Sequence, residues 1–219
     1  MKITRLGLIH TSATLIPVFQ QLVDQYLPGV STFNIVDDSL VKNIAARGGL
    51  DAAIYRRVAD YVSSAEDSGA SQVLVTCSSI GAAVEAAAGS AGVPVLRVDQ
   101  PMADQAVATG KRIGVIATLP TTLQPTAELV QRRAALAGKE IELTSKLCEG
   151  AFEALMNGDA ARHEEMVADA LRGLAAGVDV ILLAQASMAR VVESLDEKDR
   201  QIPILASPAT AIKYLATLS

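Results

Sequence analysis

Short apolar segments alternate with longer amphipathic segments along the whole chain. Eight apolar segments predict β-strands, at residues 5–10, 31–36, 72–77, 93–98, 112–118, 140–145, 178–184 and 202–206. Longer segments between them, such as 50–66 and 159–175, have helical patterns. This alternation is typical of right-handed βαβ units, so we predict an α/β fold with parallel sheets.

The two halves of this pattern resemble each other in sequence. Three pairs of segments match in the same order: RLGLIHTSAT with RIGVIATLPT, VLVTCSSIGAAVE with ILLAQASMARVVE, and VPVL with IPIL. The partners lie 107, 108 and 109 residues apart, as single-residue insertions would produce. Chance similarity among apolar strands is sufficient to explain one match, but not three matches in the same order. We therefore predict two pseudosymmetric lobes, each a small parallel sheet flanked by helices: residues 1–103 plus a C-terminal helix at 207–219, and residues 104–206.

Composition limits the possible partners. Half of the 219 residues are hydrophobic, whereas 3% are aromatic, so alanine, valine and leucine must form the core. The net charge of −5 gives no general attraction to nucleic acid or to an anionic membrane. No apolar segment reaches the roughly 20 residues that span a bilayer. The sequence therefore predicts no nucleic-acid partner and no membrane partner.

The few cysteines and histidines limit the chemistry further. The sequence has two cysteines, Cys77 and Cys148, and the segment MKITRLGLIH has no export signal. We therefore expect reduced thiols in a cytoplasmic protein. Two cysteines and two histidines, widely separated, predict no metal site.

Cys77 stands where a predicted strand ends and a helix begins. Ligands of open parallel sheets bind beyond the carboxyl ends of the strands, and the repeat places Gln185 at the equivalent position. We expect both side chains to face one cleft from opposite lobes. Ser78 and Ser79 are predicted as N-cap and first-turn residues, whose N–H groups would lower the pKa of the thiol and hold a substrate carboxylate. An inert buried thiol is the alternative.

Further polar residues end the other predicted strands. Hydroxyls of Ser12, Thr118 and Thr121 are candidates for substrate binding, with helix capping as the alternative. Ala186 and Ser187 offer a second set of backbone N–H groups.

The remaining titratable groups fall into four cases. His10 ends the first strand and is a candidate second acid or base, the alternative being a histidine bonded to a loop. His163 is predicted at a solvated helix start. Cys148, paired with Val41 by the first offset, is predicted in core packing. Asp37, Asp38 and Asp99 follow strands and are expected to have structural or gating roles.

The segments VTCSS, RIGVIATLPTT, VPVLRVDQPM and ILLAQASMARV resemble the aspartate/glutamate racemase superfamily, which includes hydantoin racemases, maleate isomerases and arylmalonate decarboxylases. The resemblance covers nearly the whole chain. It implies cofactor-independent chemistry between two lobes, with one catalytic cysteine from each lobe. Cys77 falls on the first of these cysteines, and Gln185 replaces the second.

That replacement leaves several functions open. Glutamine cannot act as a general acid or base, so it cannot complete a two-thiol racemase, and racemisation would need His10 or a bound water in place of the second cysteine. The resemblance implies an enzyme acting on a small carboxylate, an amino acid or related acid, with Cys77 as the essential thiol. A one-thiol cis–trans isomerase, a decarboxylase and a non-catalytic carboxylate binder are the alternatives. A cysteine hydrolase is not supported, because this sequence has no Cys/His/Asp arrangement. We also expect the chain to form a homo-oligomer.

Overall fold

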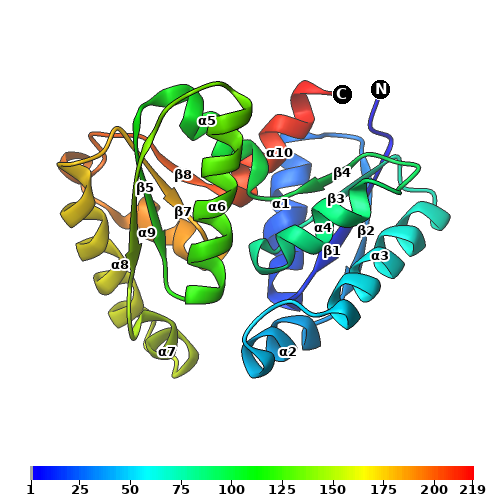
Figure 1. Cartoon of the computed structure of the whole chain (residues 1–219), viewed down its shortest axis with the longest axis horizontal. Helices are drawn as coiled ribbons and strands as arrows, with labels where there is room; N and C mark the ends of the chain where they lie inside the picture. Colours follow the sequence, from blue (N-terminus) through cyan, green and yellow to red (C-terminus); the bar gives the residue numbers. More distant parts are fainter. Residues whose placement is uncertain (1) are drawn as a thin grey trace. The chain divides into compact units, whose positions relative to one another are not determined.

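The chain forms two compact units, each with its own parallel sheet (Figure 1). The computed structural model describes residues 2–219, without the side chains of Glu193 and Lys198. The first unit runs to Asp99 and also includes Pro208–Ser219, and the second is Gln100–Ser207. Both sheets have four parallel strands flanked by helices, which confirms the predicted two-lobed α/β fold.

The first unit has the strand order β2-β1-β3-β4. Its strands are β1 (Arg5–His10), β2 (Ser31–Val36), β3 (Gln72–Val75) and β4 (Val95–Arg97). Its helices are η1 (Ala13–Leu15), α1 (Ile16–Tyr26), α2 (Ser39–Arg47), α3 (Ala52–Asp67), η2 (Ser78–Ile80), α4 (Gly81–Ala88) and α10 (Ser207–Thr217).

The second unit repeats this arrangement with the order β6-β5-β7-β8. Its strands are β5 (Arg112–Ala117), β6 (Glu142–Leu147), β7 (Val180–Leu183) and β8 (Ile204–Ala206). Its helices are α5 (Gln100–Thr109), α6 (Pro120–Leu136), α7 (Ala151–Met156), α8 (Ala160–Ala175), η3 (Ala186–Met188), α9 (Ala189–Ser194) and η4 (Glu197–Asp199).

The two sheets have the same register as well as the same strand order. Ile9 of β1 lies beside Val75 of β3, and Ile116 of β5 lies beside Leu183 of β7. The equivalent residues are 107 and 108 positions apart in the chain, which are the offsets of the sequence repeat. The duplicated unit predicted from the sequence is therefore confirmed.

One predicted strand was displaced by two residues. The prediction of 140–145 was wrong, because β6 spans Glu142–Leu147. The Lys139 N–H donates to the carbonyl of Ala134, so this part of the chain belongs to the turn that ends α6. Pairing with β5 starts only at Glu142, whose N–H donates to the carbonyl of Lys111.

Apolar layers cover both faces of each sheet. In the first unit, α3 and α4 pack on one face, and α1 and α10 pack on the other. In the second unit, α5 and α6 pack on one face, opposite α8 and α9. The central strands β3 and β7 are buried along their whole length, as expected for parallel strands covered on both sides. Between residues 2 and 219, no helix combines the length and apolar character that a membrane span requires.

A buried ion pair lies at the end of β4 and packs against Gly81, the first residue of α4. Arg97 is 2% exposed and Asp99 is fully buried. The Arg97 guanidinium donates from Nε and Nη2 to the two oxygens of Asp99, at 2.7 and 2.8 Å. It lies so close to Gly81 that a Cβ there would stand 2.2 Å from Arg97 Cζ. The bidentate pair compensates the cost of burying both charges, and only glycine leaves room for it.

We predict that Gly81→Ala is strongly destabilising. The added methyl group displaces the guanidinium and leaves Asp99 as a buried charge without its partner, which costs about 3–5 kcal/mol in comparable cases. Urea unfolding measures this free energy. Gly89→Ala is the matched control, because its Cβ would meet only the Ala86 carbonyl oxygen at 3.5 Å. Equal stabilities of the two variants would contradict the packing argument.

Candidate functional site

Cys77 lies two residues beyond β3, at the carboxyl edge of the first sheet. It has extended backbone geometry and is the N-cap residue of η2. The residue is half-buried. The strand end therefore positions the thiol where parallel sheets bind ligands, as the sequence predicted.

The surroundings of Cys77 favour the thiol over the thiolate. Burial raises the pKa of Cys77, because removing water penalises the charged form. Hydrogen bonds from the Thr11 side chain and from Ser79 and Ile80 oppose this rise without cancelling it. The expectation of a lowered pKa was therefore wrong. Desolvation outweighs the effect of the N–H groups at the start of η2.

Ser78 and Ser79 also differ from their predicted roles. They lie inside η2, both buried, and α4 begins only at Gly81. The N-cap of η2 is Cys77 itself, and its side chain makes no capping hydrogen bond. The backbone N–H groups of Ser79 and Ile80 hydrogen-bond the sulfur. The N–H groups of Ser78 and Ser79 were predicted to hold a substrate carboxylate, and in this structure the N–H of Ser79 interacts with Cys77.

His10 is fully buried, and both ring nitrogens have protein partners. Nε2 lies 2.9 Å from Oδ1 of Asn34, and Nδ1 lies 2.8 Å from Oγ1 of Thr76. Burial lowers the pKa of His10, against the opposing effect of the Asn34 hydrogen bond, so the neutral ring dominates near pH 7. An amide oxygen only accepts, so in the neutral ring Nε2 carries the proton and Nδ1 is an acceptor. The Thr76 hydroxyl proton then has two acceptors, Nδ1 at 2.8 Å and the Ile9 carbonyl at 3.2 Å. These contacts match the bonded-histidine alternative and leave neither nitrogen for a substrate proton.

Polar side chains that follow two other strands of the first unit form hydrogen bonds with neighbouring residues. The Ser12 hydroxyl lies 2.8 Å from that of Thr14. Asp37 accepts from Ser39, from the Tyr61 hydroxyl at 2.6 Å and from Arg57. Burial alone would raise the pKa of Asp37, but these hydrogen bonds and the Arg57 charge lower it. Its oxygens are saturated with donors, so Asp37 has the structural role that was expected.

Gln185 occupies the corresponding place in the second unit, two residues beyond β7. Its Oε1 accepts from the backbone N–H of Thr118 at 2.5 Å and from the Thr118 hydroxyl at 2.8 Å. Thr118 is buried and Gln185 is half-buried. The pair matches Cys77 and Thr11 in the first unit, since Thr11 and Thr118 are 107 residues apart. Sequence reasoning missed Thr11 as a partner of the thiol, although the repeat offset carried that signal.

The remaining candidates of the second unit lie at the same edge of its sheet. Thr121 is in the first turn of α6 and half-buried. Ala186 and Ser187 lie in η3, the former half-buried and the latter exposed. The second unit thus brings Thr118 and Gln185 into contact and places the other three on the elements that follow the same strands.

Cys148 was assigned to the wrong position by the sequence offset. It directly follows β6, and its N–H donates to the carbonyl of Ala117 at 2.8 Å. Asp37 makes the same contact with His10 in the first unit, so Cys148 corresponds to Asp37 and not to Val41. The expectation of core packing is confirmed, because Cys148 is 5% exposed in an apolar cluster. Burial raises the pKa of its thiol, against the charge of Lys146.

His163 is buried, so the prediction of a solvated helix start was wrong. Asp159, one turn earlier, is the exposed N-cap residue of α8. The Nδ1 of His163 donates to the carbonyl of Ala151 at 2.9 Å and joins the starts of α7 and α8. Alternating charged and apolar residues in the segment concealed which face of the helix turns inward.

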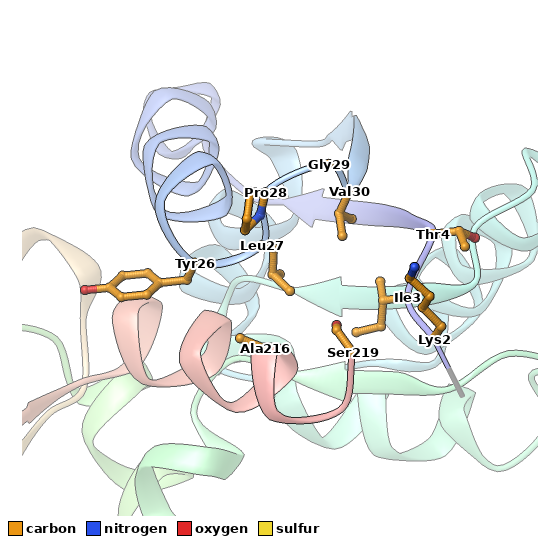
Figure 2. Close-up of a pocket in the computed structure, with 10 residues that line it drawn as sticks. All are labelled: Lys2, Ile3, Thr4, Tyr26, Leu27, Pro28, Gly29, Val30, Ala216 and Ser219. Carbon is orange, nitrogen blue, oxygen red and sulfur yellow. The ribbon is translucent and has the colours of Figure 1, made fainter.

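Two hollows lie away from Cys77 within the units. One, of about 340 Å³, is at the amino end of β1, beside the ends of α1 and α10 (Figure 2). The other, of about 640 Å³, lies between the end of β6 and α8 and includes Cys148. The hollow of about 340 Å³ lies at the amino edge of the first sheet, whereas Cys77 lies at the carboxyl edge. In residues 2–219, no group of three or more His, Cys, Asp and Glu could hold a metal ion.

Comparison with known proteins gives one family and many similar folds. The family model described as Asp/Glu/hydantoin racemase matches residues 6–215. A search of curated proteins found no match. A solved aspartate racemase from Picrophilus torridus is 13% identical, covers 98% of this chain and 94% of its own, and has a TM-score of 0.74.

Two further solved structures have the same fold. A glutamate racemase from Bacillus anthracis is 21% identical, with a TM-score of 0.73, over 100% of this chain and 82% of its own. A mutant of arylmalonate decarboxylase is 17% identical, with a TM-score of 0.63, over 97% of this chain and 93% of its own.

We predict that alkylation of Cys77 by iodoacetamide accelerates with a midpoint above the ordinary cysteine pKa of about 8.5. The thiolate is the reactive form, and burial disfavours it. Thr11→Val removes a hydrogen bond that favours the thiolate, so it moves the midpoint further up. Alkylation rates across pH measure both effects, and Cys148→Ser isolates the Cys77 signal. A native midpoint at or below about 8.5 would contradict the dominance of burial.

We predict that the buried neutral His10 makes the free energy of unfolding fall at acidic pH. Its pKa is lower in the folded protein than the unfolded value of about 6.5, so the unfolded chain binds more protons. Stability is therefore complete above pH 6.5 and falls by up to about 1.4 kcal/mol per pH unit until the folded pKa is reached. Urea unfolding between pH 8 and 5 measures the slope. Parallel curves for the native protein and His10→Gln would exclude this contribution.

Proposed function

The chain belongs to the Asp/Glu/hydantoin racemase family, and from this premise we propose that it is a cofactor-independent enzyme of racemase or isomerase type with Cys77 as its one essential thiol. The substrate is a small carboxylate. The names of similar solved structures support this class, since they include aspartate and glutamate racemases and an arylmalonate decarboxylase.

One observation carries the proposal: equivalent strand ends of the two units hold a thiol and an amide. Cys77 follows β3 beside Thr11, and Gln185 follows β7 beside Thr118. A thiol exchanges protons near neutral pH, whereas an amide does not titrate. The chemistry of proton transfer therefore belongs to the first unit alone.

A single thiol supports proton exchange on one face of a substrate carbon. The Cys77 thiolate removes the proton next to the carboxylate, which leaves a thiol and an enediolate. The same thiol then returns a proton to the same face. Its S–H exchanges with water, so deuterium from D₂O enters the substrate with retention of configuration. Inversion, and therefore racemisation, would need an acid on the opposite face. Since the ring nitrogens of His10 are bound to Asn34 and Thr76, a bound water would have to supply that proton.

The raised pKa of Cys77 favours reactions in which the thiol gives its proton. A thiol that stays protonated at pH 7 is ready to protonate an enediolate formed by loss of carbon dioxide. Decarboxylation is therefore the second candidate, ahead of cis–trans isomerisation, which starts with addition of the thiolate to a double bond. A carboxylate binder without turnover is the remaining alternative.

The proposal predicts that the reaction depends on Cys77 and not on Cys148. The native protein is incubated in D₂O with amino acids, small diacids and hydantoins, and NMR follows deuteration and conversion. We expect Cys77→Ser to lose at least about 100-fold in rate, the typical contribution of a general acid–base group. Cys148→Ser is the matched control, a buried thiol of the other unit, and should retain the native rate.

The stereochemical result then selects the reaction. Exchange with retention, or loss of carbon dioxide, supports one-thiol chemistry. Inversion would show that another group supplies the second proton. Saturable binding of a carboxylate with no exchange or conversion would establish the binder instead.

A further inference from the structure

The buried ion pair at the end of β4 lies against the segment that carries the donors of Cys77. We propose that Arg97 is a positioning residue for Cys77, and that it acts through Gly81 and Glu85 by fixing the place of η2 beside the sulfur. All four residues belong to the first unit. The importance of Arg97 for turnover rests on the proposed function.

The Arg97 guanidinium lies between the end of β4 and the first turns of α4. On the strand side it donates to both oxygens of Asp99, at 2.7 and 2.8 Å. On the helix side its Nη1 donates to Oε1 of Glu85, at 2.5 Å. The backbone of Gly81 lies so close to the guanidinium that a methyl group would not fit between them. The guanidinium therefore fixes the separation of α4 from β4, and Asp99 fixes the guanidinium.

The segment η2 connects this contact to the thiol. Three residues, Ser78–Ile80, separate Cys77 from Gly81 and form η2, and Gly81 is both the C-cap of η2 and the first residue of α4. The side chain of Ile80 is fully buried in the apolar layer under α4 and fixes η2 from the core side. Gly81 fixes its end. A change in the position of Gly81 therefore changes where the N–H groups of Ser79 and Ile80 point.

The direction of these N–H groups matters because they act on the sulfur. Apart from burial, the strongest effects on Cys77 come from the Thr11 side chain and from Ser79 and Ile80, all of them uncharged. Donors of this kind favour the thiolate, and their effect weakens steeply when distance or angle departs from the ideal. The two members of the ion pair have opposite charges, so together they add little net charge near the sulfur. We therefore expect Arg97 to act through geometry and not through its charge.

The double variant Arg97→Met/Asp99→Leu tests this inference. Apolar residues of similar size replace the buried pair, a change that is often neutral or favourable for stability, so the chain should remain folded. Met lacks the flat guanidinium, and Gly81 loses the group that fixes it. We expect the midpoint of Cys77 ionisation to rise by about 1–2 pH units, the effect of one lost hydrogen bond to a charged group.

The measurement needs no substrate. The ultraviolet absorbance of the Cys77 thiolate is followed across pH in a Cys148→Ser background. The same protein with Cys77→Ser is subtracted, which removes the signal of the tyrosines. Urea unfolding of each variant shows that the fold is retained.

Two single variants complete the test. Arg57→Met breaks a partly buried ion pair with Asp37 beyond β2, which β1 separates from β3, and should leave the Cys77 midpoint unchanged. Arg97→Lys keeps a positive charge beside Asp99 but loses the planar fork that joins β4 to α4. It should raise the midpoint as well, and it decides the question if the double variant does not fold.

The outcomes separate this inference from the proposed function. An unchanged or lowered midpoint in the folded double variant overturns the inference, and so does a native midpoint in Arg97→Lys. An equal rise in Arg57→Met would show a general effect of lost stability and would overturn it too. Raised midpoints without any Cys77-dependent reaction in D₂O support the inference and reject only the proposed function. Cys77-dependent exchange with unshifted midpoints would retain the function and overturn the inference.

Discussion

Parallel pairing of the two central strands in each unit fixes the position of every candidate group. Ile9 lies beside Val75, so the residues that follow β1 and β3 leave the sheet together. Thr11 therefore meets Cys77, and His10 meets Thr76. The same pairing of Ile116 with Leu183 brings Thr118 to Gln185. A shift of register by one residue would turn these side chains to the other face of the sheet and separate both pairs.

Two competing electrostatic effects meet at Cys77. The start of η2 supplies N–H groups that favour a thiolate, and burial against the surrounding side chains disfavours it. The same competition appears at Asp37, where burial is the larger single effect but four donors together reverse it. Position at a helix start is therefore insufficient to predict the ionisation of a thiol. The number of donors relative to the lost water decides it.

The sequence was sufficient for the alternation of strands and helices, for the two repeated parallel sheets and for the place of Cys77. Strand periodicity and the internal repeat depend on local residues, and both survive in the structure. The pKa of Cys77 and the burial of His163 were mispredicted, because both depend on neighbours distant in the chain. Cys148 was misplaced because the two units differ by four residues between their first and second strands, which a constant offset cannot represent. The contacts of His10 with Asn34 and Thr76 join three separate strand segments, which no local pattern reveals.

The protonated state of Cys77 has a consequence for the survival of the protein. Peroxides and other oxidants attack thiolates far faster than thiols, and the first product, a sulfenic acid, leads on to irreversible oxidation. Because burial raises the pKa of Cys77 despite the hydrogen bonds from Thr11 and the start of η2, we expect its sulfur to react more slowly with oxidants than an exposed cysteine does. The same desolvation that raises the pKa of Cys77 therefore also lowers the fraction of the oxidant-sensitive thiolate.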